Sequence, residues 1–331
     1  MQVKTLLLIL LLLFLSACST KEVFKPTVLG TEWENYAKSE GDLVDTSYNI
    51  ALLNNKKILT TNGIVAMDIE KNQRLISHSD GWIISASIEG EVLLTSQDDI
   101  NLQEKFQLKK TIASASVKGD NLAILFADNE LAVYSIASKS LIFKEQGTES
   151  LVVNTQIVNP FFINDLVFFS TLNGKVVIVN LELKKKLRKV IVSAEENFNN
   201  VIYFNMIGNK VIAATGFKIL SMAEKEIRVK YEIRNIVYDD KDIFITTKQG
   251  EVISLTPALE LNTRIKFPFA HFLGMISDGD KLYILEKEGY MIILNKNMKD
   301  YTVHEVDMTE DGFIFIAGKT FYVADKKILI K

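Results

Sequence analysis

The chain has 331 residues, with 38 basic and 41 acidic side chains, a net charge of −3 and one cysteine. This slightly acidic balance argues against nucleic-acid binding, which depends on an excess of positive charge. A single cysteine excludes an internal disulfide, so the fold has to be stabilised by burial of the apolar residues that make up 48% of the chain.

The first 17 residues predict an export signal. Lys4 supplies the positive charge, Leu6 to Leu15 form an apolar run, and the small residues Ser16 and Ala17 follow. The run is too short to cross a bilayer as a helix, which needs about 20 residues. We therefore expect residues 1–17 to be a cleaved signal peptide.

Cys18 directly follows this signal. The sequence Leu15-Ser16-Ala17-Cys18 resembles the bacterial lipobox, in which the chain is cleaved before the cysteine and the thiol is acylated. Ser19, rather than an aspartate, comes next, and this resembles lipoproteins that are exported to the outer membrane. The prediction is a lipid anchor at Cys18 that holds the protein on the periplasmic face of the outer membrane.

Residues 18–42 lack any repeated pattern and predict a tether between lipid and domain. Charged residues, Pro26, Gly30 and Gly41 are spread through this stretch. Trp33 and Tyr36 are unusual in a tether, so they either pack on the edge of the domain or belong to a short helix. We expect this segment to take no part in the core.

From residue 43 onward the sequence repeats a hairpin pattern, and residues 160–182 are its clearest copy. An apolar run from Leu166 to Phe169 is followed by Asn173-Gly174 and by an alternating run over residues 176–180. Asn-Gly between two such runs is a strong signal for a two-residue hairpin turn. The segment therefore predicts two antiparallel strands.

Seven further copies of this pattern can be recognised at an average spacing of about 36 residues. Their turns are expected at residues 62–63, 98–99, 129–130, 215–216, 249–250, 288–289 and 318–319. A strand-only repeat of this length predicts an all-β fold, a β-propeller of four-stranded blades over residues 43–331. Eight blades are favoured and seven are the alternative, and a β-sandwich remains a second possible fold.

The strands of the first unit are expected at residues 47–53, 57–61, 64–69 and 74–77. Ring closure is expected to join residues 328–330 to the blade that contains the first strands near residue 45, because an open ring would leave unpaired edges.

The unit over residues 45–74 resembles the repeat of the pyrroloquinoline-quinone-like propellers. Asn62-Gly63 stands at the turn of that repeat, and Ala66-Met67-Asp68 stands at its Ala-Leu-Asp motif. Together with the lipobox, this pattern resembles the BamB-like lipoproteins. The resemblance implies a scaffold that assists assembly of outer-membrane β-barrel proteins, with a BamA-like barrel protein and unfolded outer-membrane proteins as partners. No partner-binding residue of that family can be matched to this chain.

An enzyme or a ligand-binding propeller is the alternative, because quinone-dependent dehydrogenases share this fold. His78, His271 and His304 are the only histidines, and they are far apart without metal-ligand spacing. The sequence shows no motif for a catalytic nucleophile. We therefore predict a protein without catalytic residues, metal or cofactor.

One dense run of positive charge lies at residues 184–189, and its cations are Lys184, Lys185, Lys186, Arg188 and Lys189. Such a run is typical of a solvated outer strand. It could also contact anionic lipid or an acidic partner, because adjacent lysines act together near a charged surface.

Overall fold

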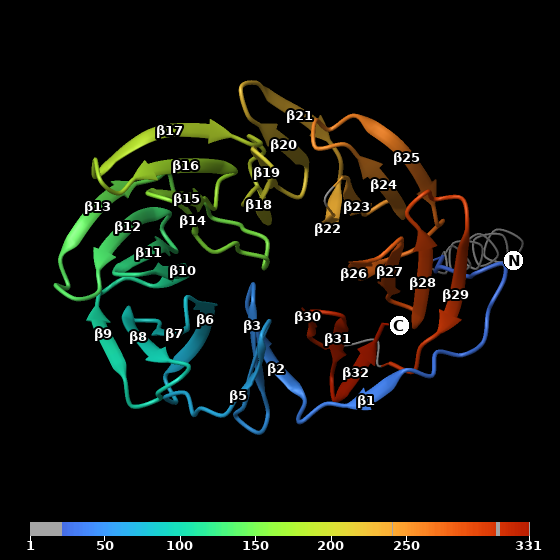
Figure 1. Ribbon diagram of the computed structural model, residues 1–331, viewed down its shortest axis with the longest axis horizontal. Helices are drawn as coiled ribbons and strands as arrows, with labels where there is room; N and C mark the ends of the chain where they lie inside the picture. The colour runs from blue at the N-terminus through green and yellow to red at the C-terminus, as the bar shows by residue number, and fades with distance from the viewer. Residues whose placement is uncertain (1–21, 240, 309–311, 331) are drawn as a thin grey trace, which may run out of the picture.

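The computed structural model describes residues 22–239, 241–308 and 312–330. These residues form 32 strands in eight four-stranded antiparallel sheets. The sheets are the blades of a ring (Figure 1). The predicted all-β propeller is confirmed, and the blade number is eight.

Blades 1 to 4 each consist of four consecutive strands. Blade 1 contains β2 (Leu43–Thr46), β3 (Ile50–Leu53), β4 (Ile58–Thr60) and β5 (Gly63–Val65); blade 2 contains β6 (Gln73–Ser79), β7 (Trp82–Ser87), β8 (Glu91–Ser96) and β9 (Gln103–Gln107); blade 3 contains β10 (Ile112–Lys118), β11 (Asn121–Phe126), β12 (Glu130–Ser135) and β13 (Leu141–Gln146); blade 4 contains β14 (Phe161–Ile163), β15 (Leu166–Ser170), β16 (Lys175–Asn180) and β17 (Lys185–Ile191).

Blades 5 to 7 repeat this order, and blade 8 departs from it. Blade 5 contains β18 (Tyr203–Ile207), β19 (Lys210–Ala214), β20 (Lys218–Met222) and β21 (Glu226–Lys230); blade 6 contains β22 (Ile233–Tyr238), β23 (Ile243–Thr247), β24 (Glu251–Leu255) and β25 (Leu261–Lys266); blade 7 contains β26 (Phe272–Asp278), β27 (Lys281–Glu286), β28 (Tyr290–Asn295) and β29 (Tyr301–Glu305); blade 8 contains β30 (Ile314–Ala317), β31 (Thr320–Val323), β32 (Lys326–Leu329) and, as its outermost strand, β1 (Tyr36–Lys38). In the ring, β10, β26 and β30 lie near the centre, and β13, β29 and β1 lie at the rim (Figure 1).

The ring closes through β1, which pairs antiparallel with β32. Tyr36 lies opposite Ile328, and Lys38 lies opposite Lys326. The Asn35 side chain adds a 3.0 Å hydrogen bond to the carbonyl oxygen of Leu329. Closure therefore uses the residues before blade 1, and the predicted joining of residues 328–330 to the blade that contains the strands near residue 45 is wrong.

The described part of the predicted tether, residues 22–42, is bound to the ring. Phe24 is 5% exposed and Trp33 is 4% exposed, and each belongs to an apolar cluster of the propeller. The expectation that this segment takes no part in the core is therefore corrected. The repeat pattern could not show this, because β1 is only 3 residues long and its partner strand lies at the other end of the chain.

Five of the eight predicted hairpins lie between the second and third strands of their blades, as in residues 173–174 of blade 4. The other three occupy different places. Residues 62–63 and 98–99 connect a third strand to a fourth, and residues 318–319 connect a first strand to a second. Residues 74–77 likewise belong to the first strand of blade 2. Apart from β1 and β32, every pair of neighbouring strands in a blade is a hairpin, so the hairpin signal alone does not fix a strand's position.

The turn between second and third strands has a common construction. Thr171 directly follows β15 and Thr247 ends β23. Each hydroxyl accepts a hydrogen bond from the backbone N–H four residues later, at 3.0 and 3.1 Å. Gly174 follows with a φ of 78°, in the left-handed region that glycine enters without strain. A Cβ at this position would lie 2.6 Å from the carbonyl oxygen of Ser193, in the connection that follows the blade. The close approach of that connection is a second reason for glycine at position 174.

Candidate functional site

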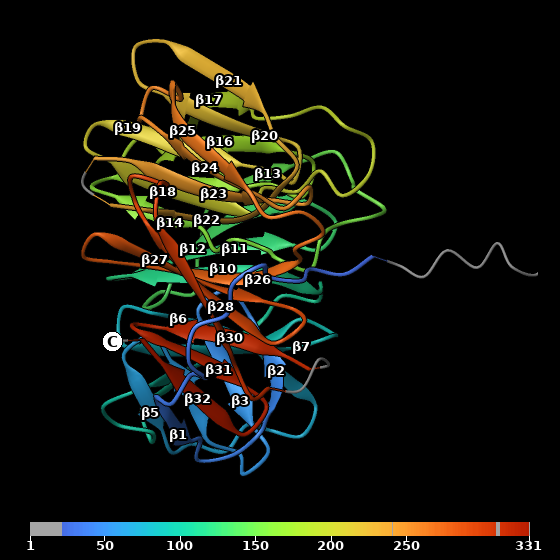
Figure 2. The same ribbon diagram turned by 90° about the vertical axis from the view of Figure 1, so that its right-hand side faces the viewer.

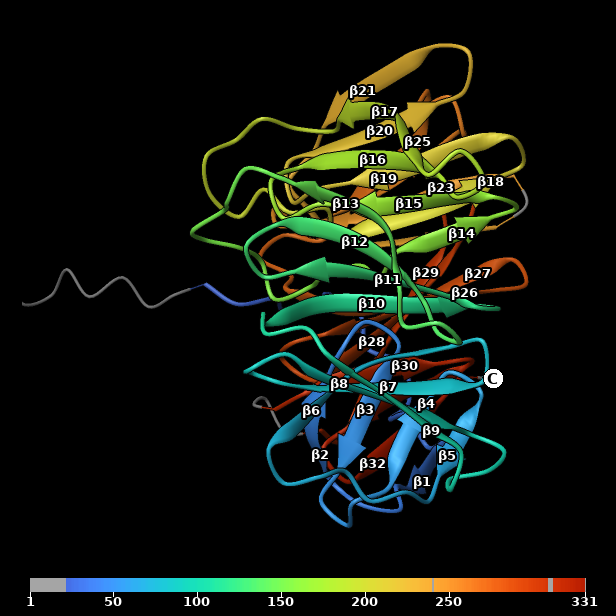
Figure 3. The same ribbon diagram turned by 90° about the vertical axis from the view of Figure 1, so that its left-hand side faces the viewer.

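The propeller presents two faces with different connections. Because the strands of a blade alternate in direction, the connections between second and third strands and those between successive blades lie on one face, which we call the loop face. The first-to-second and third-to-fourth connections lie on the opposite face, which we call the turn face. Figures 2 and 3 show the longest connections on one side of the ring and the C-terminus on the other.

Two long connections, residues 147–160 and 192–202, belong to the loop face and are held in place by buried asparagines. Asn129 donates to the carbonyl oxygen of Thr148 at 2.7 Å and accepts from the backbone of Leu172 at 3.0 Å. Asn200, which is fully buried, accepts from the backbone of Asn154 at 2.6 Å. These bonds join blades 3, 4 and 5, so the two connections have a defined shape.

The loop face also exposes large apolar side chains. Leu151 is 94% exposed, Ile88 is 73% exposed, Phe198 is 51% exposed and Phe269 is 53% exposed. Both phenylalanines have positive φ values, 53° for Phe198 and 64° for Phe269. A bulky residue rarely adopts that conformation, so these two positions are unusual in both backbone and exposure.

The turn face carries a second apolar set at its rim. Leu102, Leu141 and Leu183 stand at or just before the outermost strands of blades 2, 3 and 4, and they are 49%, 49% and 57% exposed. We call these three residues the leucine strip. Leu261 has the corresponding position in blade 6 and is 53% exposed.

The predicted basic run lies beside this strip, mainly on β17. Lys186 Nζ lies 2.7 Å from Glu145 Oε1 of β13, and Arg188 forms an ion pair with Glu226 of β21. Lys189 lies 3.9 Å from the same Glu145 carboxylate. These cations link outer strands of neighbouring blades. Lys184 and Lys185 have no acidic partner among the described residues, so they remain the members of the run that could contact another molecule.

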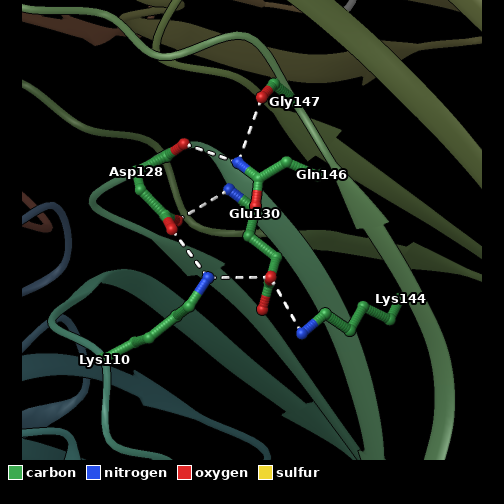
Figure 4. Close-up of polar contacts among 6 residues, drawn as sticks. All are labelled: Lys110, Asp128, Glu130, Lys144, Gln146 and Gly147. Atoms are coloured by element: carbon green, nitrogen blue, oxygen red, sulfur yellow. Dashed lines mark hydrogen bonds and ion pairs between the residues drawn. The ribbon is translucent and has the colours of Figure 1, made fainter.

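A buried carboxylate marks the boundary between blades 2 and 3 (Figure 4). Glu130 is 3% exposed, and its Oε2 lies 2.8 Å from Lys110 Nζ and 2.9 Å from Lys144 Nζ. Lys110 also lies 2.7 Å from Asp128, and its hydrogen bonds to the two carboxylates raise its pKa. Every charge here has an opposite partner, so the cluster stabilises the junction and offers no free catalytic group.

The innermost strands are joined around the axis by polar side chains. Ser77 and Ser79 of β6 donate to backbone carbonyls of β10 at 2.6 and 2.8 Å. Asn49, at the tip of the β2–β3 hairpin, donates to the carbonyl oxygen of His78 at 2.6 Å and accepts from Asn159 at 3.2 Å. The latter bond joins residues 110 apart in sequence, and it links blade 1 to the connection that precedes blade 4.

A pocket of about 300 Å³ lies against the inner strands β18, β22, β26 and β30. Tyr203, Tyr238, Met275 and Ile316 are among its lining residues. Burial raises the pKa of the Tyr203 phenol far above its ordinary value, so this hydroxyl stays protonated. The pocket is mainly apolar, and the titratable side chains among its lining residues are the two tyrosines, Tyr203 and Tyr238.

The three histidines lie in separate places. His78 is in β6, the backbone of His271 donates to Glu286 at 2.9 Å, and the His304 ring contacts the carbonyl oxygen of Thr31 at 2.7 Å. Within residues 22–239, 241–308 and 312–330, no group of three or more His, Cys, Asp or Glu side chains could hold a metal ion. The same ranges contain no helix long and apolar enough to cross a membrane. Cys18 and the predicted signal peptide lie outside the described residues.

The exposed aromatic and leucine positions were not recognised as candidate sites from the sequence. Phe198 stands in the polar run from Glu195 to Asn200, and Leu183 directly precedes the basic run. An isolated large apolar residue in a polar connection is the signal that could have found them.

No family model matches the chain. Two sequence relatives are the plasminogen-binding proteins PgbB of Helicobacter pylori strains J99 and 26695. Each is 27% identical over 347 aligned residues, which cover 91% of this chain and 64% of the relative. The chain therefore spans less than two thirds of the length of these relatives.

Solved structures similar to this chain are β-propellers. BamB from Moraxella catarrhalis has a TM-score of 0.68 at 10% identity, with 91% of this chain and 98% of that chain covered. The computationally designed Ika8 protein has a TM-score of 0.62 at 12% identity, with 91% and 99% covered. The C-terminal WD40 domain of Sif2 has a TM-score of 0.58 at 12% identity, with 94% and 99% covered. Such identities show the fold alone, and at that level the predicted resemblance to BamB-like propellers is confirmed.

Proposed function

We propose that this protein is a non-enzymatic scaffold of the bacterial cell envelope, anchored through acylated Cys18 on the periplasmic face of the outer membrane. Its BamB-like role is to assist assembly of outer-membrane β-barrel proteins by binding a BamA-like barrel protein and unfolded barrel precursors. The lipobox and the eight-bladed fold support this proposal. The buried ion cluster at Glu130, whose charges are all paired, gives no support to an enzyme.

The observation that carries the proposal is the leucine strip with its neighbouring lysines. Three consecutive blades present Leu102, Leu141 and Leu183 at one rim, each about half exposed. Lys184 and Lys185 stand next to the last of them without an acidic partner in the described chain. Exposed apolar side chains beside free cations suit a partner segment that carries both apolar and acidic residues.

The experiment is a crosslinking capture from membranes with a photoreactive residue at position 141 or 183. The control carries the same residue at position 261, which has the equivalent exposed place in blade 6. We expect the barrel-assembly protein to be captured from 141 and 183 and not from 261. Equal capture from all three positions, or no capture together with tight binding of a small molecule to the purified protein, contradicts the proposal.

A second candidate function is plasminogen binding, which the relatives' name states for them and which 27% identity over 91% of the chain favours. Lys184 and Lys185, beside the leucine strip, are the cations of the basic run that have no acidic partner among the described residues. Binding of the purified protein to plasminogen, measured with and without Lys184→Glu and Lys185→Glu, tests this candidate. Charge reversal is expected to weaken binding at least tenfold, whereas unchanged binding would exclude this surface.

A further inference from the structure

The N-terminal segment is fixed to the ring from Phe24 onward. The Phe24 ring packs edge-on against Phe267 at 6.1 Å and Tyr290 at 5.7 Å between ring centroids. Further along, the backbone of Gly30 donates to Val303 and that of Trp33 donates to Glu305, both at 2.8 Å. These bonds attach the segment to the outermost strand of blade 7.

This attachment leaves a short connection to the predicted lipid anchor. A fully extended chain from Cys18 to Phe24 spans at most about 20 Å. The described chain begins on the side of the ring from which the long loops project, as both side views show (Figures 2 and 3). An acyl chain on Cys18 would therefore bring the loop face, rather than the turn face, close to the bilayer.

Two exposed phenylalanines on the loop face have a strained backbone conformation. Phe198 lies in the connection from blade 4 to blade 5, and Phe269 lies in the connection from blade 6 to blade 7, beside the Phe267 ring that holds Phe24. Their positive φ values strain the backbone, and their half-exposed rings contribute little burial to the fold. Both features are explained if the rings contact a second apolar phase.

We infer that the loop face lies against the lipid surface, with Phe198 and Phe269 inserted at the interface; this rests on the acylation of Cys18 proposed above. The acyl chains on Cys18 would hold the protein on the bilayer, and a second apolar contact through the two rings would fix its orientation there. Glu195 and Glu196 stand next to Phe198, so the contact depends on apolar insertion rather than on attraction to anionic lipid. The leucine strip, on the turn face, then points away from the membrane and stays open to partners.

Spin labels on the full acylated protein in phosphatidylcholine vesicles test this orientation. Single cysteines replace Phe198 or Phe269, and Leu141→Cys and Leu183→Cys on the turn face serve as controls. We expect the ratio of collisions with oxygen to collisions with a water-soluble nickel complex to be several-fold higher at 198 and 269 than at 141 and 183. Raising the salt concentration should leave this ratio unchanged.

Mass spectrometry of the N-terminal peptide separates the two ways in which the inference could fail. If Cys18 is acylated and the labels at 198 and 269 are as water-accessible as the controls, the orientation is wrong and the anchor stands. If the labels at 141 and 183 are the shielded ones, the orientation is reversed and the inference is equally overturned. If Cys18 carries no lipid, the proposed anchor fails, and the orientation that rests on it fails with it.

Discussion

Blade 4 and blade 8 have the same four-stranded sheet but are built from different parts of the chain. Blade 4 uses the continuous segment from β14 to β17, with Asn173-Gly174 at its central turn. Blade 8 takes three strands from the C-terminal end and its outermost strand from residues 36–38. The hydrogen bond from Asn35 to Leu329 joins residues 294 apart in sequence.

The difference shows where the fold depends on local and on distant contacts. The hairpins of blade 4 close short loops, so their pairing costs little chain entropy. The closure of blade 8 has to order both ends of the chain at once, and a longer loop is more costly to close. Burial of Trp33 and Phe24 against the ring offsets that cost, and we expect these residues to matter more than their position outside the repeats suggests.

The largest expected effect comes from truncating one buried aromatic in each region. Trp33→Ala and Phe169→Ala should each lower the free energy of unfolding by about 3–5 kcal/mol, because both remove a buried ring. Hydrogen exchange should distinguish them: Trp33→Ala accelerates exchange first in β1 and β32, and Phe169→Ala first in β12 and β15. Uniform acceleration throughout the ring in both variants would show that blade 8 does not open separately.

Glycine substitutions should give a smaller and unequal effect. At Gly174 an added Cβ meets Asn199 Nδ2 at 2.4 Å, whereas at Gly318, in the β30–β31 turn, nothing lies within 4 Å. Both have positive φ, 78° and 55°. We expect Gly174→Ala to cost about 2–3 kcal/mol and Gly318→Ala about 1 kcal/mol, measured by urea unfolding. Equal costs would mean that backbone strain alone decides both positions.

The position three residues before the turn glycine differs between blades, and in blade 7 it should make stability depend on pH. Blade 4 has Thr171 at this position, and blade 7, which holds the N-terminal segment, has Glu286. Burial raises the pKa of Glu286, although backbone N–H groups of His271 and Glu288 oppose the shift. A raised folded-state pKa favours folding while the carboxyl is protonated, and that contribution is lost as the pH rises through the folded-state pKa.

Glu286→Gln should therefore remove a fall in stability that the unchanged protein shows between the ordinary glutamate pKa of about 4.5 and the raised folded-state pKa of Glu286. The measurement is the free energy of unfolding of both proteins across this range. Parallel curves for the two proteins would contradict the assignment to Glu286.

The smallest effects are expected in the basic run on the rim of blade 4. Lys186→Ala removes the ion pair with Glu145 and should cost about 0.2–1 kcal/mol, less at high salt. Lys184→Ala should stay within about 0.5 kcal/mol of the unchanged protein. Thermal unfolding at low and high salt distinguishes the two, and an equal loss in both variants would show that the Glu145 contact contributes nothing.

The sequence by itself determined the all-β class and the repeated hairpin, and it favoured eight blades over seven, because alternating apolar residues and Asn-Gly or Gln-Gly turns are local signals. It could not assign three of the hairpins to the correct pair of strands, since every pair in a blade has the same pattern. Only the tertiary structure showed that residues 22–38 belong to the ring, because the partners of Phe24, Trp33 and β1 lie near the other end of the chain, in the segment from Phe267 to Ile328. The exposed residues Phe198, Phe269 and Leu183 likewise became candidates only when the ring placed them on particular faces, since an apolar residue in the sequence does not reveal whether the fold buries it.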